Sequence, residues 1–138
     1  MGTPLHLFLE LNQVYNFTHD PCPLTRNPVN CLDRDWGERN FVNPPFNNIG
    51  PFFEKAVSEM KKNRLSVFLV PFRSFNAYWN IVNDNAAEVF VFTQGITFAG
   101  YTKPFREPMA IVVFDPTKKP FVPLKKIFRP CSNLLKLQ

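Results

Sequence analysis

The sequence Asn43-Pro44-Pro45-Phe46 combines residue types that could activate the amino group of a nucleobase. An exocyclic amino nitrogen is a poor nucleophile, because its lone pair is delocalised into the ring. The side-chain oxygen of Asn43 and the carbonyl of Pro44 could accept its two N–H bonds and draw the nitrogen towards tetrahedral geometry. The two prolines would hold these acceptors in place at little entropic cost. Phe46 could stack on the base, a contact worth about 1–3 kcal/mol.

The same four residues also fit a rigid turn without a chemical role. Their context bears on the choice, because residues 40–42 are predicted to form a short strand that stops abruptly at Asn43. Neither proline can donate a hydrogen bond to a sheet ladder. The pattern therefore predicts a rigid loop at the end of a strand, and it favours the active-site interpretation over the plain turn.

The elements that must position this loop follow from hydrophobic periodicity. Thr3 and Pro4 favour a cap and first turn for a short amphipathic helix over residues 5–11. Pro51 opens a second helix, with apolar positions recurring up to Met60, and residues 77–82 predict a third. Strands are predicted at 40–42, 65–70, 88–92 and 109–114, with a further possible strand at 96–98.

Strands alternating with helices predict an α/β fold around a mostly parallel sheet flanked by helices. Ligands of such folds bind at the carboxyl ends of the strands. Residues 43–46 and 71–73 each follow a predicted strand. We therefore expect both loops to face one crevice.

Charge divides the chain into two predicted regions, a domain over residues 1–116 and a basic tail over 117–138. The tail holds six basic and no acidic residues, whereas the domain holds ten basic and eleven acidic ones. Such a tail suits DNA phosphates, although a solvated tail that only aids solubility is an equal alternative. The residues proposed to contact DNA here are Lys118, Lys119, Lys125 and Lys126.

Three cysteines, without a CxxC pair or histidines at ligand spacing, argue against a disulfide framework or a metal site. They favour a reducing cytoplasm as the setting. The start of the chain has no basic segment ahead of its apolar run, and Glu10 and Asn12 interrupt that run. It therefore predicts neither a signal peptide nor a membrane span.

Several short motifs, in order, are similar to those of the small bacteriophage-type DNA N6-adenine methyltransferases. The resemblance extends over about residues 3–114. The matching segments are Thr3-Pro4, Phe17-Thr18-His19-Asp20-Pro21-Cys22, Trp36, Asn43-Pro44-Pro45-Phe46, Pro51-Phe52-Phe53-Glu54-Lys55-Ala56, Leu69-Val70-Pro71-Phe72-Arg73, Trp79 and Ala110-Ile111-Val112-Val113-Phe114.

The resemblance implies a compact Rossmann-like methyltransferase fold with a reduced N-terminal half. It also implies S-adenosylmethionine as methyl donor, adenine N6 in DNA as target and residues 43–46 as the catalytic loop. The cofactor site it implies comprises Thr3, Pro4, Asp20, Pro21 and Cys22. Asp20 could equally be a turn residue before Pro21. Arg73 could hold a DNA phosphate or a carboxylate, or form a surface ion pair.

The chain departs from the family pattern at two places. It has no glycine-rich GxG loop, and Gln94-Gly95 stands where the family usually has Gly-Arg. Two alternatives therefore stay open. One keeps the chemistry but changes the target to RNA adenine or a protein glutamine, and the other is an inactive nucleic-acid-binding module. Binding of the methyl donor separates the inactive module from the enzymes.

Overall fold

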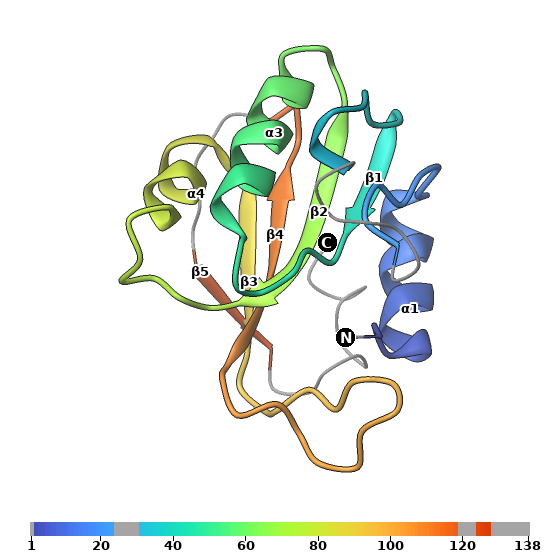
Figure 1. Ribbon diagram of the computed structural model, residues 1–138, viewed down its shortest axis with the longest axis vertical. Coiled ribbons are helices and arrows are strands. Elements are labelled where there is room, and N and C mark those ends of the chain that lie inside the picture. The colour runs from blue at the N-terminus through green and yellow to red at the C-terminus, as the bar shows by residue number, and fades with distance from the viewer. Residues whose placement is uncertain (1, 24–30, 119–123, 128–138) are drawn as a thin grey trace.

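The computed structural model describes residues 2–23, 31–118 and 124–127, and it contains one sheet between two layers of helix (Figure 1). Helix α1 (Leu5–Tyr15) covers one face. Helices α3 (Gly50–Met60) and α4 (Trp79–Asn85) cover the other. The strands are β1 (Arg39–Val42), β2 (Leu65–Pro71), β3 (Glu88–Phe92), β4 (Met109–Phe114) and β5 (Leu124–Ile127).

The five strands follow the order β1-β2-β4-β3-β5. The β1–β2 and β3–β5 pairs are parallel, whereas β4 is antiparallel to both β2 and β3. The fold is α/β, but its sheet is mixed, and the expected mostly parallel pairing is not confirmed. The reason lies in residues 93–108, which join β3 to β4 as a loop. A parallel return would have needed a crossover, usually a helix.

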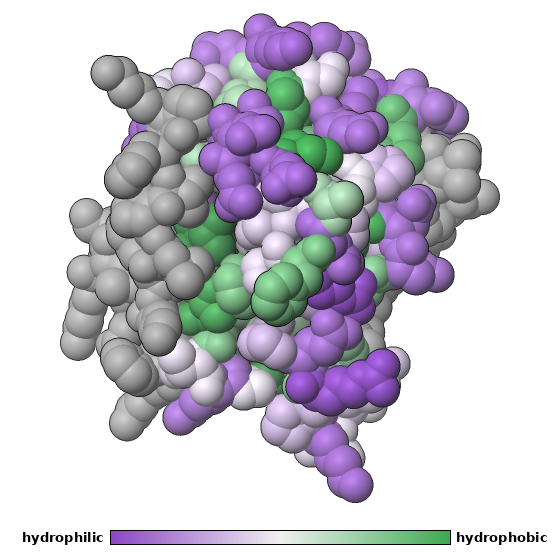
Figure 2. All heavy atoms as spheres, turned by 90° about the vertical axis from the view of Figure 1, so that its left-hand side faces the viewer, coloured by the Kyte–Doolittle hydropathy of each residue, from purple (hydrophilic) through white to green (hydrophobic). Residues whose placement is uncertain are grey.

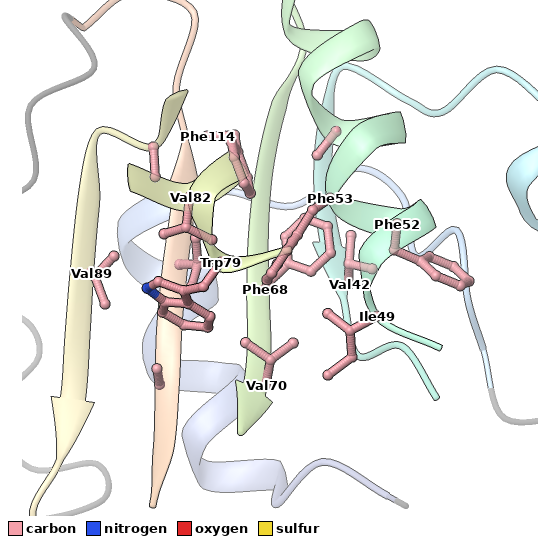
Figure 3. Close-up of a cluster of buried hydrophobic side chains, with 14 of the residues drawn as sticks. Val42, Ile49, Phe52, Phe53, Phe68, Val70, Trp79, Val82, Val89 and Phe114 are labelled. Carbon is pink, nitrogen blue, oxygen red and sulfur yellow. The ribbon is translucent and has the colours of Figure 1, made fainter. Parts of the chain in front are cut away.

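The strands are buried on both faces because side chains of successive residues point to opposite sides. In β2, Phe68 and Val70 pack under α3 and α4, while Val67 and Leu69 pack under α1. Figure 3 shows the first of these clusters, where Phe53 of α3 meets Phe68 and Trp79. This double coverage explains why 65–70 is almost continuously apolar.

Most predicted elements form, with changes at their ends. Residues 88–92 and 109–114 are strands over the predicted ranges. The first helix runs to Tyr15, and Pro4, not Thr3, occupies its N-cap position. Residues 96–98 are not a strand, although Ile96 and Phe98 are buried. Their burial explains the apolar pattern that suggested one.

Part of the predicted tail lies in the sheet, since β5 pairs with β3 from Val89↔Leu124 to Phe92↔Ile127. Residues 119–123 and 128–138 lie outside the described part of the chain, so the division at residue 116 stays a prediction. On the side of the molecule where α4 lies, hydrophilic side chains cover much of the surface and hydrophobic ones gather near its middle (Figure 2).

Candidate active site

Three loops leave the carboxyl ends of strands at the same edge of the sheet. Residues 43–49 follow β1, 72–78 follow β2 and 93–108 follow β3, and these three strands run in the same direction. All three loops lie at the lower end of the sheet in Figure 1, together with the start of α1. This edge holds Asn43-Pro44-Pro45-Phe46, and contacts between the loops show how it is assembled.

Asn43 is half-buried directly after the buried end of β1. Its Nδ2 donates a hydrogen bond to Oγ1 of Thr3, at 3.0 Å. Thr3 lies just before α1, so the bond joins the loop after β1 to the helix on one face of the sheet. Because a terminal amide rotates freely unless a partner holds it, this bond fixes the plane of the Asn43 amide.

Phe46 packs against aromatic side chains of the loop between β3 and β4. Its ring centroid lies 5.9 Å from that of Phe98 and 5.4 Å from that of Phe105, and both contacts are edge-to-face. Such pairs stabilise by about 0.5–1.5 kcal/mol beyond the area they bury. The 93–108 loop therefore forms a wall beside the Asn-Pro-Pro-Phe loop and restricts the Phe46 ring.

Arg73 ties all three loops together. Its Nε and Nη2 donate to the two carboxylate oxygens of Glu107, each at 2.8 Å, and its Nη1 donates to the backbone carbonyl of Phe46. The bond to Arg73 holds the pKa of the Glu107 carboxyl below its usual range, and the same pair raises the pKa of Arg73. Of the predicted partners of Arg73, the structure shows a carboxylate of this chain. Contact with DNA phosphate stays a prediction.

A further link joins the N-terminal segment to the 93–108 loop. The backbone N–H of Ala99 donates to the carbonyl of Gly2 at 2.8 Å, and the two residues form an isolated antiparallel bridge. Since Thr3 follows Gly2, the residue that orients the Asn43 amide is itself anchored on the wall that packs against Phe46.

A family model described as DNA N-6-adenine-methyltransferase (Dam) matches residues 1–103. The chain belongs to this family. The matched part contains Asn43-Pro44-Pro45-Phe46, Arg73 and most of the loop after β3. The chain is also 35% identical over 63 residues to a DNA N-6-adenine-methyltransferase of Escherichia phage T1. That match covers 44% of this chain and 26% of the phage protein.

The residues of this Dam-family chain that were predicted to bind the cofactor fall into two places. Thr3 and Pro4 lie beside Asn43. Asp20 follows His19, which forms a parallel bridge with Asn40 of β1, so the segment leaves the sheet in the same direction as the loop that begins at Asn43. Asp20 is exposed, and its Oδ1 accepts a hydrogen bond from the N–H of Cys22 at 3.0 Å. The turn geometry is therefore present, and a cofactor contact stays a prediction.

Pro21 and Cys22 are buried beneath this turn, and Cys31 lies buried nearby. Burial, followed by the neighbouring Cys31, raises the pKa of the Cys22 thiol to about 12. This shift favours the protonated thiol at neutral pH. Within residues 2–23, 31–118 and 124–127, no three potential ligand side chains converge as a metal site.

Lys118 lies away from this site. It binds Glu88 at 3.0 Å, where β3 begins and β4 has ended, at the opposite edge from Asn43. Lys119 lies outside the described residues. Lys125 and Lys126 belong to β5, and their side chains are likewise not described. In the part of the chain that the structure describes, no helix has the length and apolar character needed to cross a membrane.

Sequence reasoning missed the partners that assemble the site. Glu107 binds Arg73, and Phe98 and Phe105 pack on Phe46. Only the abundance of phenylalanine indicated aromatic packing of this kind, and no signal paired Glu107 with an arginine 34 residues earlier in the chain. Phe75 was also missed, and it is a fully exposed aromatic residue in the 72–78 loop.

Proposed function

We propose that this chain methylates the N6 amino group of adenine in DNA, with S-adenosylmethionine as donor. The observation that carries the proposal is the position of Asn43-Pro44-Pro45-Phe46 at the carboxyl end of β1, held by Thr3 and Arg73, in a member of the Dam family. A Rossmann-like cofactor-binding arrangement is part of the proposal, and the α/β fold is compatible with it.

The loop's own residues would act on the amino group of the target base. The Asn43 side-chain oxygen and the Pro44 carbonyl accept its two N–H bonds, which localises the lone pair on nitrogen. The Phe46 ring lies along the base and fixes its angle. Bound S-adenosylmethionine supplies a methyl group activated by its sulfonium. As the new N–C bond forms, the bond between the methyl group and the donor's sulfur would break and leave a neutral thioether, and the nitrogen would release one proton to solvent.

Position provides much of the rate in such a transfer, because aligned reactants need little further activation. The bonds from Thr3 to Asn43 and from Arg73 to Phe46 fix the two ends of the loop. A base inside a duplex must first be extruded, at a cost of a few kcal/mol. The proposal therefore includes DNA contacts outside the loop that offset this cost.

The donor site is proposed beside Thr3, Pro4 and the turn from Asp20 to Cys22. An exposed carboxylate such as that of Asp20 is chemically suited to the ammonium group or ribose hydroxyls of the donor. The buried Pro21 and Cys22 give the turn a rigid base. These residues fit the donor's functional groups without a glycine-rich loop.

The test is transfer of labelled methyl from S-adenosylmethionine to unmethylated DNA, with RNA and protein measured in parallel. We expect label in DNA, recovered as N6-methyladenine after digestion. Asn43→Ala should abolish transfer, whereas Asn47→Ala, at an exposed position of the same loop, should retain it. Label in RNA or protein would keep the chemistry and change the target. If no substrate is labelled and calorimetry detects no binding of S-adenosylmethionine, the proposed methyltransferase activity is refuted.

A further inference from the structure

The loop between β3 and β4 contains a surface depression of about 320 Å³. It is lined by Phe98, Tyr101, Lys103, Pro104, Phe105 and Arg106. Phe98 is buried and Phe105 half-buried, whereas 57% of the Tyr101 surface is exposed. The depression thus has an aromatic interior and an aromatic side chain at its solvent side. Its volume is at the lower end of small-ligand sites, which begin at about 300 Å³.

Backbone contacts fix the shape of this depression. The N–H of Phe105 donates to the carbonyl of Ile96 at 2.7 Å, which closes the neck of the loop. Gly95 lies so close to Pro104 that an added Cβ would approach its Cβ to 2.6 Å. Gly100 turns the tip with φ +86. A preformed surface of this kind binds without a large ordering cost.

The depression is continuous with the catalytic loop through shared aromatic rings. Phe98 and Phe105, which line it, are the two residues that pack on Phe46. They also contact each other edge-to-face, with centroids 5.9 Å apart. A molecule held in the depression would therefore lie next to the predicted position of the target base.

The charged side chains beside the depression indicate which kind of molecule it could bind. Lys103 and Arg106 are both exposed, and neither joins an ion pair among the residues that the structure describes. The nearest carboxylate in sequence, Glu107, is already held by Arg73. Aromatic surface beside two available cations matches a nucleotide, whose base has a π-face and whose phosphates are anionic.

We infer that this depression binds a nucleotide of the DNA strand that flanks the target adenine, with its base on Tyr101 and its phosphates on Lys103 and Arg106. The inference rests on the proposed function. It supplies a contact outside the catalytic loop that would help to hold an opened strand. It also gives Lys103 and Arg106 the phosphate-binding role in a chain whose Arg73 is occupied by Glu107.

The test compares binding of a fluorescent twelve-nucleotide single-stranded DNA with binding of linear polyphosphate, which has no bases. Tyr101→Ala should weaken DNA binding by about 5- to 150-fold and change polyphosphate binding by less than about twofold, because only a base can stack. Lys103→Gln and Arg106→Gln should weaken both, and each should lower the salt slope for DNA by about 0.7.

Matched controls exist at exposed positions away from the depression. Lys61→Gln removes a cation just after α3, and Leu9→Ala removes an apolar side chain from α1. If wild type binds and methylates DNA but all three loop variants behave like these controls, the inference is wrong and the proposed function stands. If wild type neither binds nor methylates DNA, both fail. If the wild type binds single-stranded RNA more tightly than DNA, and the three loop variants weaken RNA binding to the same extent, the depression binds RNA and the inference of a DNA nucleotide is wrong.

Discussion

Two charged side chains hold loops together at opposite edges of the sheet, at very different depths. Glu59 is fully buried, and it accepts from the N–H of Trp36 at 2.6 Å and from Arg64 at 3.1 and 3.0 Å. Arg73, at the candidate active site, has 26% of its side chain exposed and binds a Glu107 that is 28% exposed. The first network lies inside the protein, whereas the second is partly open to solvent, where an ion pair contributes less to stability.

Removal of the buried charge of Glu59 should have the largest effect on stability. Glu59→Gln should lower the free energy of unfolding by about 3–5 kcal/mol, because the neutral amide removes the buried charge that pairs with Arg64 and replaces one of the two acceptor oxygens with an NH2 donor. Urea denaturation measures the loss. Glu54→Gln, at an exposed position of the same helix, is the matched control. Equal stability of the two variants would contradict the structural role of Glu59.

The corresponding change at the other edge should affect activity more than stability. Arg73→Lys keeps the charge but cannot bind Glu107 in a bidentate manner and Phe46 at the same time. We expect methyl transfer to fall by about 100-fold through misplacement of the loop, while stability changes by less than about 1 kcal/mol. Arg34→Lys, at an exposed position, is the control. If Arg73→Lys lowered the free energy of unfolding as much as Glu59→Gln, the expected difference between the two networks would be contradicted.

Lowering the pH should weaken the ion pair between Arg73 and Glu107, because the carboxylate becomes protonated. The Glu107 carboxyl has a pKa below its usual range in the folded protein. Its pairing therefore stabilises the fold above the unfolded-state pKa of about 4.3, and the contribution is lost as pH falls through the lowered folded-state pKa. At pH 7 the free energy of unfolding of the wild type should exceed that of Glu107→Gln by less than about 1 kcal/mol. The difference should shrink as pH falls below the unfolded-state pKa, and a difference that does not change with pH would refute the ionic origin.

The smallest expected effect concerns Lys118, whose side chain is 50% exposed beside Glu88. Lys118→Ala should change stability by less than about 1 kcal/mol. It should also change the salt slope of DNA binding less than Arg106→Gln does, because Lys118 lies at the edge opposite Asn43. A larger change in slope would place DNA across both edges and restore Lys118 as a phosphate contact.

The sequence was informative where periodicity and rigid residues determine the structure. Proline placed the loop after β1 and the start of α3, and continuous apolar character identified β2 as buried. Long-range pairing was harder to predict. Nothing local showed that β4 inserts between β2 and β3, or that Glu107 binds Arg73. The tail shows the same limit, since its charge suggested either a DNA-binding or a solvated tail and did not predict that residues 124–127 pair with β3.

The central position of β4 has a consequence for the order of folding. Helices α1 and α3 can assemble with β1 and β2 from local chain, but β3 has only β4 and β5 as partners. Until β4 joins, β2 and β3 each present an unpaired backbone edge in a mostly apolar strand, which is a template for wrong association. We expect β3, and the amides of β2 that face β4, to become protected from hydrogen exchange only when β4 does. One late strand would then set the time during which the newly made chain needs shielding.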